Sequence, residues 1–131
     1  MTPLAILYVD DDEDIRHIVR LSLALDGGIA LQTAGTAAEA LVLLDRGPPP
    51  QVALLDVMMP GTDGLALLTL LRARPDTATL PVIFMTAKGR PADAALYRAR
   101  GALGMILKPF DPLDLANQIR TLMQAGPNES G

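Results

Sequence analysis

The feature that most constrains the fold is a repeated alternation between short apolar runs and longer segments with helical periodicity. The runs are bounded by Gly, Pro or Asp, and several are apolar throughout, which is typical of strands buried on both faces of a parallel sheet. We therefore predict strands at residues 4–9, 29–34, 51–56, 81–86 and 104–108.

Segments of helical pattern lie between and after the predicted strands. Their apolar residues recur with helical spacing, and Gly or Pro closes each segment. The residues expected to face inward are Ile15, Ile18, Val19 and Leu23; Ala37, Ala40, Leu41 and Leu44; Leu67, Leu68 and Leu71; Ala94, Ala95 and Leu96 within 91–100; and Leu115, Ala116, Ile119, Leu122 and Met123 within 112–124. Five such βα units predict an α/β fold with an open, doubly wound, five-stranded parallel sheet. The ligand site of such a sheet lies outside the carboxyl ends of its strands.

Length and charge narrow the class further. The 131 residues fit one domain, which we place at 1–125, followed by a flexible tail at 126–131. A net charge of −4 with no basic face argues against a nucleic-acid partner. No disulfide or thiolate metal site is expected, because the chain has no cysteine. We also expect a cytoplasmic protein with no membrane partner, since no apolar stretch approaches the ~18 residues that span a bilayer.

Polar side chains stand at the ends of four predicted strands. The first strand leads into Asp10 and Asp11, the third ends in Asp56, the fourth in Thr86 and the fifth in Lys108. These side chains are expected to meet at one edge of the sheet. There Asp11 and Asp56 would offer oxygen ligands to Mg²⁺, and Asp10 would reach the ion through a water. A carboxylate beside a cation is also a nucleophile toward phosphorus, a role that we assign to Asp56, with Lys108 and Thr86 as donors to the phosphoryl oxygens.

Residues 10–14 are five consecutive acids, and part of this run has a simpler explanation. Residues 12–14 are expected to form the cap and first turn of a helix, where acidic side chains are favoured. Asp10 and Asp11 emerge directly from the strand, so we assign them to the site. His17 is expected on the surface of the first helix.

Four segments carry a resemblance to a known family. ILYVDDDEDIR, LLDVMMPGTDGL, VIFMTA and GMILKPF resemble, in order and in spacing, the motifs of the response-regulator receiver domain of two-component signalling. The resemblance extends over about residues 4–124 and implies a flavodoxin-like sheet with strand order 2-1-3-4-5. It implies Mg²⁺ as cofactor, with Mn²⁺ as an alternative, and a cis bond between Lys108 and Pro109. The roles that it implies are metal binding by Asp10, Asp11, Asp56 and the backbone carbonyl of Met58, phosphoryl acceptance by Asp56, and phosphoryl contacts by Thr86 and Lys108.

The same resemblance implies a stand-alone response regulator. Such a protein would take a phosphoryl group from a sensor histidine kinase or a histidine phosphotransfer protein, and would catalyse only its own aspartyl phosphorylation and dephosphorylation. Its last two βα units would contact a downstream protein in a phosphorylation-dependent way. A phosphorelay shuttle, or a receiver module of a longer regulator or hybrid kinase, are the alternatives. A haloacid-dehalogenase-like phosphatase is less favoured, because Asp14 stands where its Asp-x-Asp motif expects Thr or Val.

The sequence departs from the family at one switch position. Met105, three residues before Lys108, replaces an aromatic residue whose rotation often accompanies the switch. A flexible thioether can repack without the two discrete states of a ring, so the output mechanism is left open. We expect Tyr97 to be a surface residue rather than a substitute for that aromatic residue, and Lys88 to lie in a solvated loop.

Overall fold

The computed structural model describes residues 3–87 and 89–125, in which strands and helices alternate along the chain. The strands are β1 (Leu4–Val9), β2 (Ile29–Ala34), β3 (Val52–Asp56), β4 (Val82–Thr86) and β5 (Gly104–Leu107). The helices are α1 (Glu13–Ala24), α2 (Ala37–Arg46), α3 (Gly64–Arg72), α4 (Pro91–Ala99) and α5 (Leu115–Ala125). Each predicted strand is present to within a residue at either end. The predictions for Lys88 and for the tail at 126–131 lie outside the described residues.

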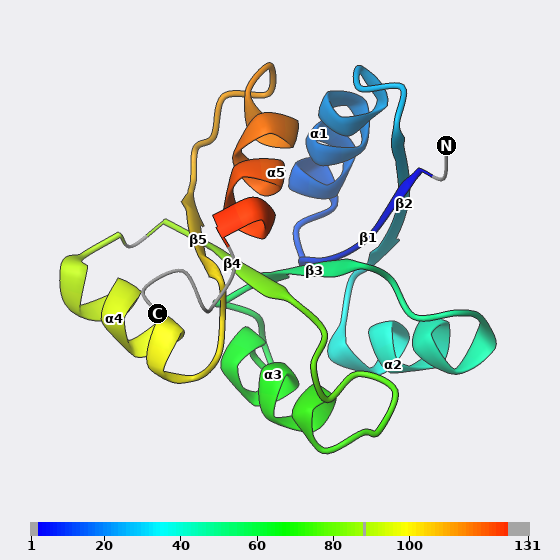
Figure 1. Ribbon diagram of the computed structural model, residues 1–131, viewed down its shortest axis with the longest axis vertical. Coiled ribbons are helices and arrows are strands. Elements are labelled where there is room, and N and C mark those ends of the chain that lie inside the picture. The colour runs from blue at the N-terminus through cyan, green and yellow to red at the C-terminus, as the bar shows by residue number, and fades with distance from the viewer. Residues whose placement is uncertain (1–2, 88, 126–131) are drawn as a thin grey trace.

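The strands form one parallel sheet in the order β2-β1-β3-β4-β5, which confirms the expected topology. Helices α1 and α5 cover one face, and α2, α3 and α4 cover the other (Figure 1). Every residue of β3 and β4 is buried, which explains why their sequences show no polar alternation. Because all strands run parallel, the carboxyl ends of the central strands β1, β3 and β4 point to one edge of the sheet.

Two hydrophobic clusters, one on each face of the sheet, form the core. Strand β1 contributes to both, since successive side chains of a strand point to opposite faces. Ile6 and Tyr8 pack in the cluster beneath α1 and α5, whereas Leu7 and Val9 pack in the cluster beneath α2, α3 and α4. With the sheet buried on both sides, the ends of its strands are the places where the backbone can present polar groups to solvent.

Helix α1 begins where the acidic run predicts it. Asp12 is its N-cap and accepts hydrogen bonds from the backbone N–H groups of Asp14 at 2.9 Å and Ile15 at 3.2 Å. Val19 and Leu23 are buried as expected, but Ile18 is 41% exposed, so the apolar face was predicted slightly too wide. Helix capping of this kind therefore explains part of the acidic run without any further role.

Helix α5 begins later than the pattern from 112 predicts. A turn occupies residues 112–114, in which Asp111 Oδ1 accepts a hydrogen bond of 2.9 Å from the backbone N–H of Leu113. This side-chain bond competes with the helical backbone pattern. The helix therefore starts only at Leu115.

The prediction for helix α4 was wrong about which face is buried. Tyr97 is only 5% exposed and packs against Phe84 of β4, with ring centroids 5.0 Å apart, whereas Ala95 and Leu96 face solvent. The large ring of Tyr97 fills the space between the helix and the sheet, which the three residues expected to face inward do not fill. Tyr97 is thus a core residue and not the expected surface residue.

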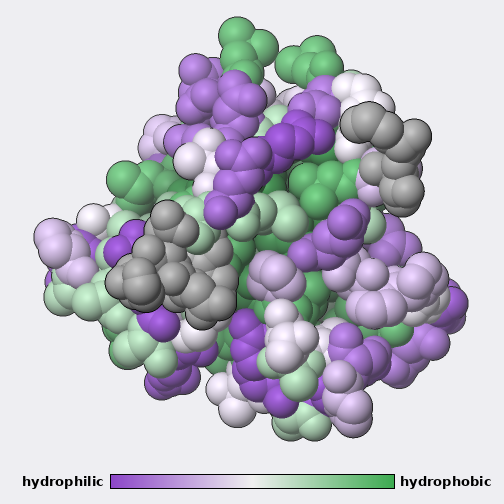
Figure 2. Space-filling view, in the orientation of Figure 1, coloured by the Kyte–Doolittle hydropathy of each residue, from purple (hydrophilic) through white to green (hydrophobic). Residues whose placement is uncertain are grey.

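The visible surface is largely hydrophilic, with hydrophobic groups at the upper rim, near the C-terminal end of α1 and the loop before α5 (Figures 1 and 2). Leu25 and Leu113 are 69% and 80% exposed and line a shared shallow hollow. His17 is exposed, as predicted. Within the described ranges, no helix combines the length and apolar character needed to cross a bilayer.

Candidate functional site

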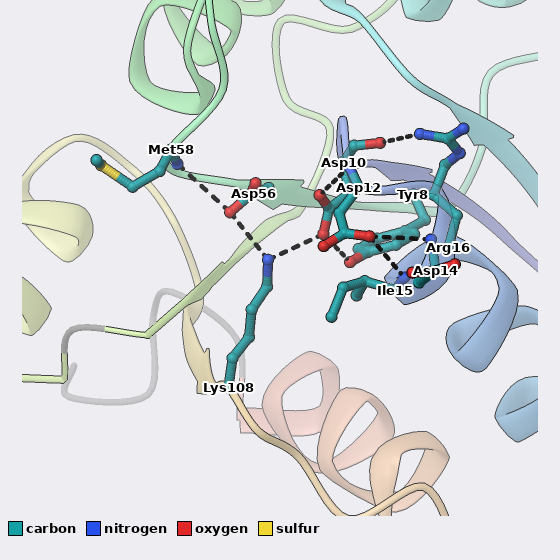
Figure 3. Close-up of polar contacts among 9 residues, drawn as sticks. All are labelled: Tyr8, Asp10, Asp12, Asp14, Ile15, Arg16, Asp56, Met58 and Lys108. Atoms are coloured by element: carbon teal, nitrogen blue, oxygen red, sulfur yellow. Dashed lines mark hydrogen bonds and ion pairs between the residues drawn. The ribbon is translucent and has the colours of Figure 1, made fainter.

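The polar residues predicted from the strand ends meet at the carboxyl edge of the sheet. Lys108 Nζ lies 2.9 Å from Asp10 Oδ2 and 3.1 Å from Asp56 Oδ1, so it bridges residues on β3 and just after β1 (Figure 3). Asp10, Asp11 and Asp56 each offer a carboxylate oxygen, and these oxygens lie within 4.8 Å of one another. Asp10 and Asp56 are buried, whereas Asp11 is exposed and opens the group to solvent.

The carboxylate of Asp10 is held by three donors. Tyr8 donates its hydroxyl to Oδ2 at 2.5 Å, the backbone N–H of Asp12 donates to Oδ1 at 2.9 Å, and Lys108 provides the third bond, to Oδ2. Arg16 also fixes the backbone here, because its Nη1 donates to the carbonyl oxygen of Asp10 at 2.6 Å. Asp10 is therefore fixed in orientation at both its side chain and its backbone.

Asp56 is the last residue of β3, and the following loop folds back over it. Its Oδ1 accepts a long hydrogen bond of 3.4 Å from the backbone N–H of Met58, whose side chain points away from the acids (Figure 3). The start of α3 approaches the strand end so closely that a Cβ on Gly64 would lie 2.3 Å from the carbonyl oxygen of Asp56. Only glycine fits there without displacing the backbone.

The site carries more negative than positive charge. Burial and the neighbouring charge of Asp10 raise the pKa of Asp56 to about 6, against an opposing effect of Lys108. Burial alone would also raise the pKa of Asp10, but the hydrogen bonds from Tyr8, Asp12 and Lys108 outweigh it and hold that pKa below its ordinary value. For Lys108, burial alone would lower the pKa, but the two carboxylates raise it. One ammonium group thus compensates the buried acids incompletely.

Thr86 and Lys108 stand side by side at the ends of β4 and β5. Thr86 is 2% exposed, and its carbonyl oxygen accepts a hydrogen bond of 2.8 Å from the backbone N–H of Lys108. The peptide bond between Lys108 and Pro109 is cis, as the family resemblance implies. The two side chains predicted to contact a phosphoryl group are therefore presented from adjacent strands.

The donor set fits a hard divalent cation. It consists of carboxylate oxygens alone, with no nitrogen or sulfur ligand, and Mg²⁺ and Mn²⁺ prefer such ligands. The incompletely compensated charge gives a cation a further reason to bind. The exposed edge at Asp11 leaves room for the waters that Mg²⁺ retains.

The sequence did not single out Tyr8, whose hydroxyl donates to Asp10, or Arg16, which donates to the Asp10 carbonyl oxygen. Asp10 directly follows β1 and lies two residues after Tyr8, so the two side chains share a face, and the length of the ring brings the hydroxyl to the carboxylate. A tyrosine in the middle of a buried strand also needs a partner for its hydroxyl. In a chain with only 3% aromatic residues, that combination was a usable signal.

Met105, the position that departs from the family, is partly buried beneath the α4 face. It packs against the same hydrophobic cluster that contains Phe84 and Tyr97. The aromatic side chains of this region therefore come from β4 and α4 rather than from β5.

Comparison with known proteins gives a consistent result. The family model for the response regulator receiver domain matches residues 6–120. The chain is 34% identical over 131 residues, 99% of its length, to the phosphate regulon transcriptional regulatory protein PhoB of Pseudomonas aeruginosa, covering 56% of that protein. It is 36% identical over 130 residues to an uncharacterized 14.6 kDa protein of Leptolyngbya boryana, covering 99% of this chain and 98% of that protein.

Solved structures agree. The chemotaxis response regulator CheY4 of Vibrio cholerae superposes with a TM-score of 0.83 at 29% identity, over 92% of this chain and 99% of that one. The receiver domain of a signal transduction histidine kinase from Syntrophus aciditrophicus gives a TM-score of 0.76 at 30% identity, over 92% of this chain and 90% of that one. The chain spans about half the length of several curated relatives, PhoB among them.

Proposed function

This chain belongs to the response regulator receiver domain family, and we propose that it accepts a phosphoryl group from a phosphohistidine onto Asp56 in a Mg²⁺-dependent reaction. The donor would be a sensor histidine kinase or a histidine phosphotransfer protein. The observation that carries this proposal is the convergence of three carboxylates on one point, with Lys108 Nζ 3.1 Å from Asp56 Oδ1.

The proposed step forms one bond and breaks one. A carboxylate oxygen of Asp56 attacks phosphorus, the P–N bond to the imidazole of the donor breaks with its electron pair going to nitrogen, and the imidazole, already protonated on its other ring nitrogen, leaves as neutral histidine. Asp10, Asp11, Asp56 and the carbonyl of Met58 would hold the Mg²⁺, which supplies positive charge for the phosphoryl oxygens. Lys108, whose Nζ lies 3.1 Å from Asp56 Oδ1, would donate to one phosphoryl oxygen, and the hydroxyl of Thr86 would donate to another.

We propose that the protein catalyses only its own aspartyl phosphorylation and dephosphorylation. In the proposed reaction the nucleophile is part of the chain and becomes the product, so each turnover modifies the protein itself. Loss of the phosphoryl group by hydrolysis would return it to the starting state. We therefore assign it no external substrate other than the phosphodonor.

Labelling with a small phosphodonor tests the acceptor. Wild-type protein with acetyl phosphate and Mg²⁺ should gain one hydroxylamine-labile phosphoryl group, detected by intact mass. Asp56→Asn should abolish the label, and Asp45→Asn, an exposed acid paired with Arg74, should keep it. Undiminished labelling of Asp56→Asn would refute the assignment.

We propose that output runs through the last two βα units. Leu96 of α4 and Leu107 of β5 are 43% and 49% exposed, and a hollow of about 280 Å³ lies between β5 and α5, lined in part by Met105 and Leu122. Exposed apolar surface of this kind favours a protein partner over a nucleic acid. Pull-down with beryllofluoride-treated and untreated protein tests this, and identical partner sets would contradict it.

Two alternative settings have specific support. The longer relatives favour a receiver module of a larger regulator, and the kinase receiver domain favours a module of a hybrid kinase. The relative of nearly equal length favours a single-domain regulator or a phosphorelay shuttle. Transfer of label from the phosphorylated chain to an added histidine phosphotransfer protein would identify the shuttle.

A further inference from the structure

We propose that Tyr8 is a positioning residue that limits Asp10 to one free oxygen, Oδ1, and thereby favours Mg²⁺ over Ca²⁺ at the site. This proposal rests on the proposed function, since it concerns the same metal site. It assigns a role to a side chain that does not itself contact the metal or the phosphoryl group.

Tyr8 lies inside the sheet, out of contact with solvent. Its side chain is fully buried in β1, between β2 and β3, and packs in the cluster beneath α1 and α5. Its hydroxyl donates to Asp10 Oδ2 at 2.5 Å (Figure 3). Because the ring is enclosed by the sheet and the helices above it, the hydroxyl is a fixed donor rather than a rotating one.

The Asp10 carboxylate has few acceptor positions left for a metal. An ionised carboxylate offers about four lone-pair directions. Oδ2 receives Tyr8 and Lys108, and Oδ1 receives the backbone N–H of Asp12. One direction is left, and it belongs to Oδ1.

This arrangement has a consequence for the choice of metal. Ca²⁺ takes more ligands than Mg²⁺ and often binds carboxylates through both oxygens, whereas Mg²⁺ uses single oxygens and retains several waters. With Oδ2 occupied, Asp10 can bind the metal through Oδ1, directly or through a water. It cannot bind the metal through both carboxylate oxygens. Removal of the Tyr8 hydroxyl would free a lone pair on Oδ2 and relax that restriction.

Tyr8→Phe removes the hydroxyl and keeps the ring. The experiment is calorimetric titration of the unphosphorylated full chain with MgCl₂ and, separately, CaCl₂. The ratio of the Ca²⁺ Kd to the Mg²⁺ Kd should fall by about fivefold or more in Tyr8→Phe, as expected for the loss of a hydrogen bond to a charged group. A ratio within about twofold of wild type would overturn the proposal.

The chain offers a matched control in its other tyrosine. Tyr97→Phe deletes the same atom from a buried ring on the opposite face of the sheet, so both Kd values should stay at wild-type levels. A general loss of stability would weaken the binding of both metals alike and leave the ratio of the two Kd values unchanged. An equal fall of the ratio in both variants would therefore overturn the proposal.

A second measurement needs no change at Tyr8. In Tyr97→Phe, Tyr8 is the single remaining tyrosine, so the near-ultraviolet absorption of tyrosine reports on it alone. Addition of Mg²⁺ should shift that band with the calorimetric Kd, because the hydroxyl is bonded to a carboxylate of the site. An unchanged absorption band during saturation with Mg²⁺ would contradict the proposal.

The outcomes distinguish this proposal from the proposed function. If wild type binds neither ion, the metal part of the proposed function fails as well, whereas an unchanged ratio of Kd values in Tyr8→Phe refutes the role of Tyr8 alone.

Discussion

Replacing Asp56 by Asn should stabilise the metal-free protein at neutral pH. The pKa of Asp56 rises from its ordinary value of 3.8 to about 6 because its carboxylate is buried and lies near Asp10. At ~1.4 kcal/mol for each pKa unit, ionised Asp56 lowers the free energy of unfolding by about 3 kcal/mol. Asn resembles the neutral acid in shape and never ionises, so it avoids this cost.

The sign of the effect sets the pH window. A raised pKa in the folded state means that the folded protein holds its proton longer than the unfolded chain does. The contribution of Asp56 is therefore fully favourable below about pH 4 and is lost as the pH rises through about 6. The difference between Asp56→Asn and wild type should be near zero at pH 4 and about 3 kcal/mol at pH 7.5.

Urea unfolding in EDTA, followed by circular dichroism at both pH values, measures this difference. The depressed pKa of Asp10 adds its own pH dependence, but it affects both proteins and largely cancels in the comparison. Asp45→Asn is the control, since an exposed ion pair contributes little. Equal stability of Asp56→Asn and wild type at pH 7.5, or a destabilised variant, would refute the electrostatic argument.

Four further substitutions test other parts of the site and fold. Asp11→Asn should weaken Mg²⁺ binding by about tenfold or more with little change in unfolding free energy, because it removes an exposed carboxylate that we propose as a ligand; calorimetry checks this. Lys108→Ala should uncouple partner binding from phosphorylation, and partner binding that still responds fully to beryllofluoride would count against it. Gly64→Ala should cost about 1–3 kcal/mol of stability, measured by urea unfolding, because its Cβ would meet the carbonyl oxygen of Asp56; an unchanged midpoint would contradict the close approach. Tyr97→Ala should cost about 3–5 kcal/mol in the same assay, and a cost near zero would show that the ring is not part of the core.

Much of the fold could be predicted because its signals are local and agree with one another. Short, continuous apolar runs bounded by Gly, Pro or Asp are typical of strands in a sheet covered on both faces, and the meeting of Asp56 and Lys108 at one edge follows from parallel strand direction. The order of the strands was less accessible, since it depends on crossovers that no local pattern encodes. That order came from the family resemblance.

The errors in the prediction also have physical causes. Tyr97 was expected at the surface of its helix, but a ring of its size stabilises the fold more when it is buried against Phe84. Tyr8 was overlooked because its partner lies beyond the strand, and a hydrogen bond between residues on one face leaves no mark in hydropathy. Both cases concern aromatic residues with a polar end, for which hydropathy alone does not determine the environment.

The burial of Tyr97 also indicates how α4 behaves as a unit. It is the only fully buried residue of that helix, whereas α3 buries Gly64, Leu67, Leu68 and Leu71. A helix that buries so little apolar surface can detach at low free-energy cost while the sheet stays intact. Amide protons of α4 should therefore exchange with deuterium well before those of α3, which makes α4 the segment whose local opening a signal at the strand ends could most easily bias.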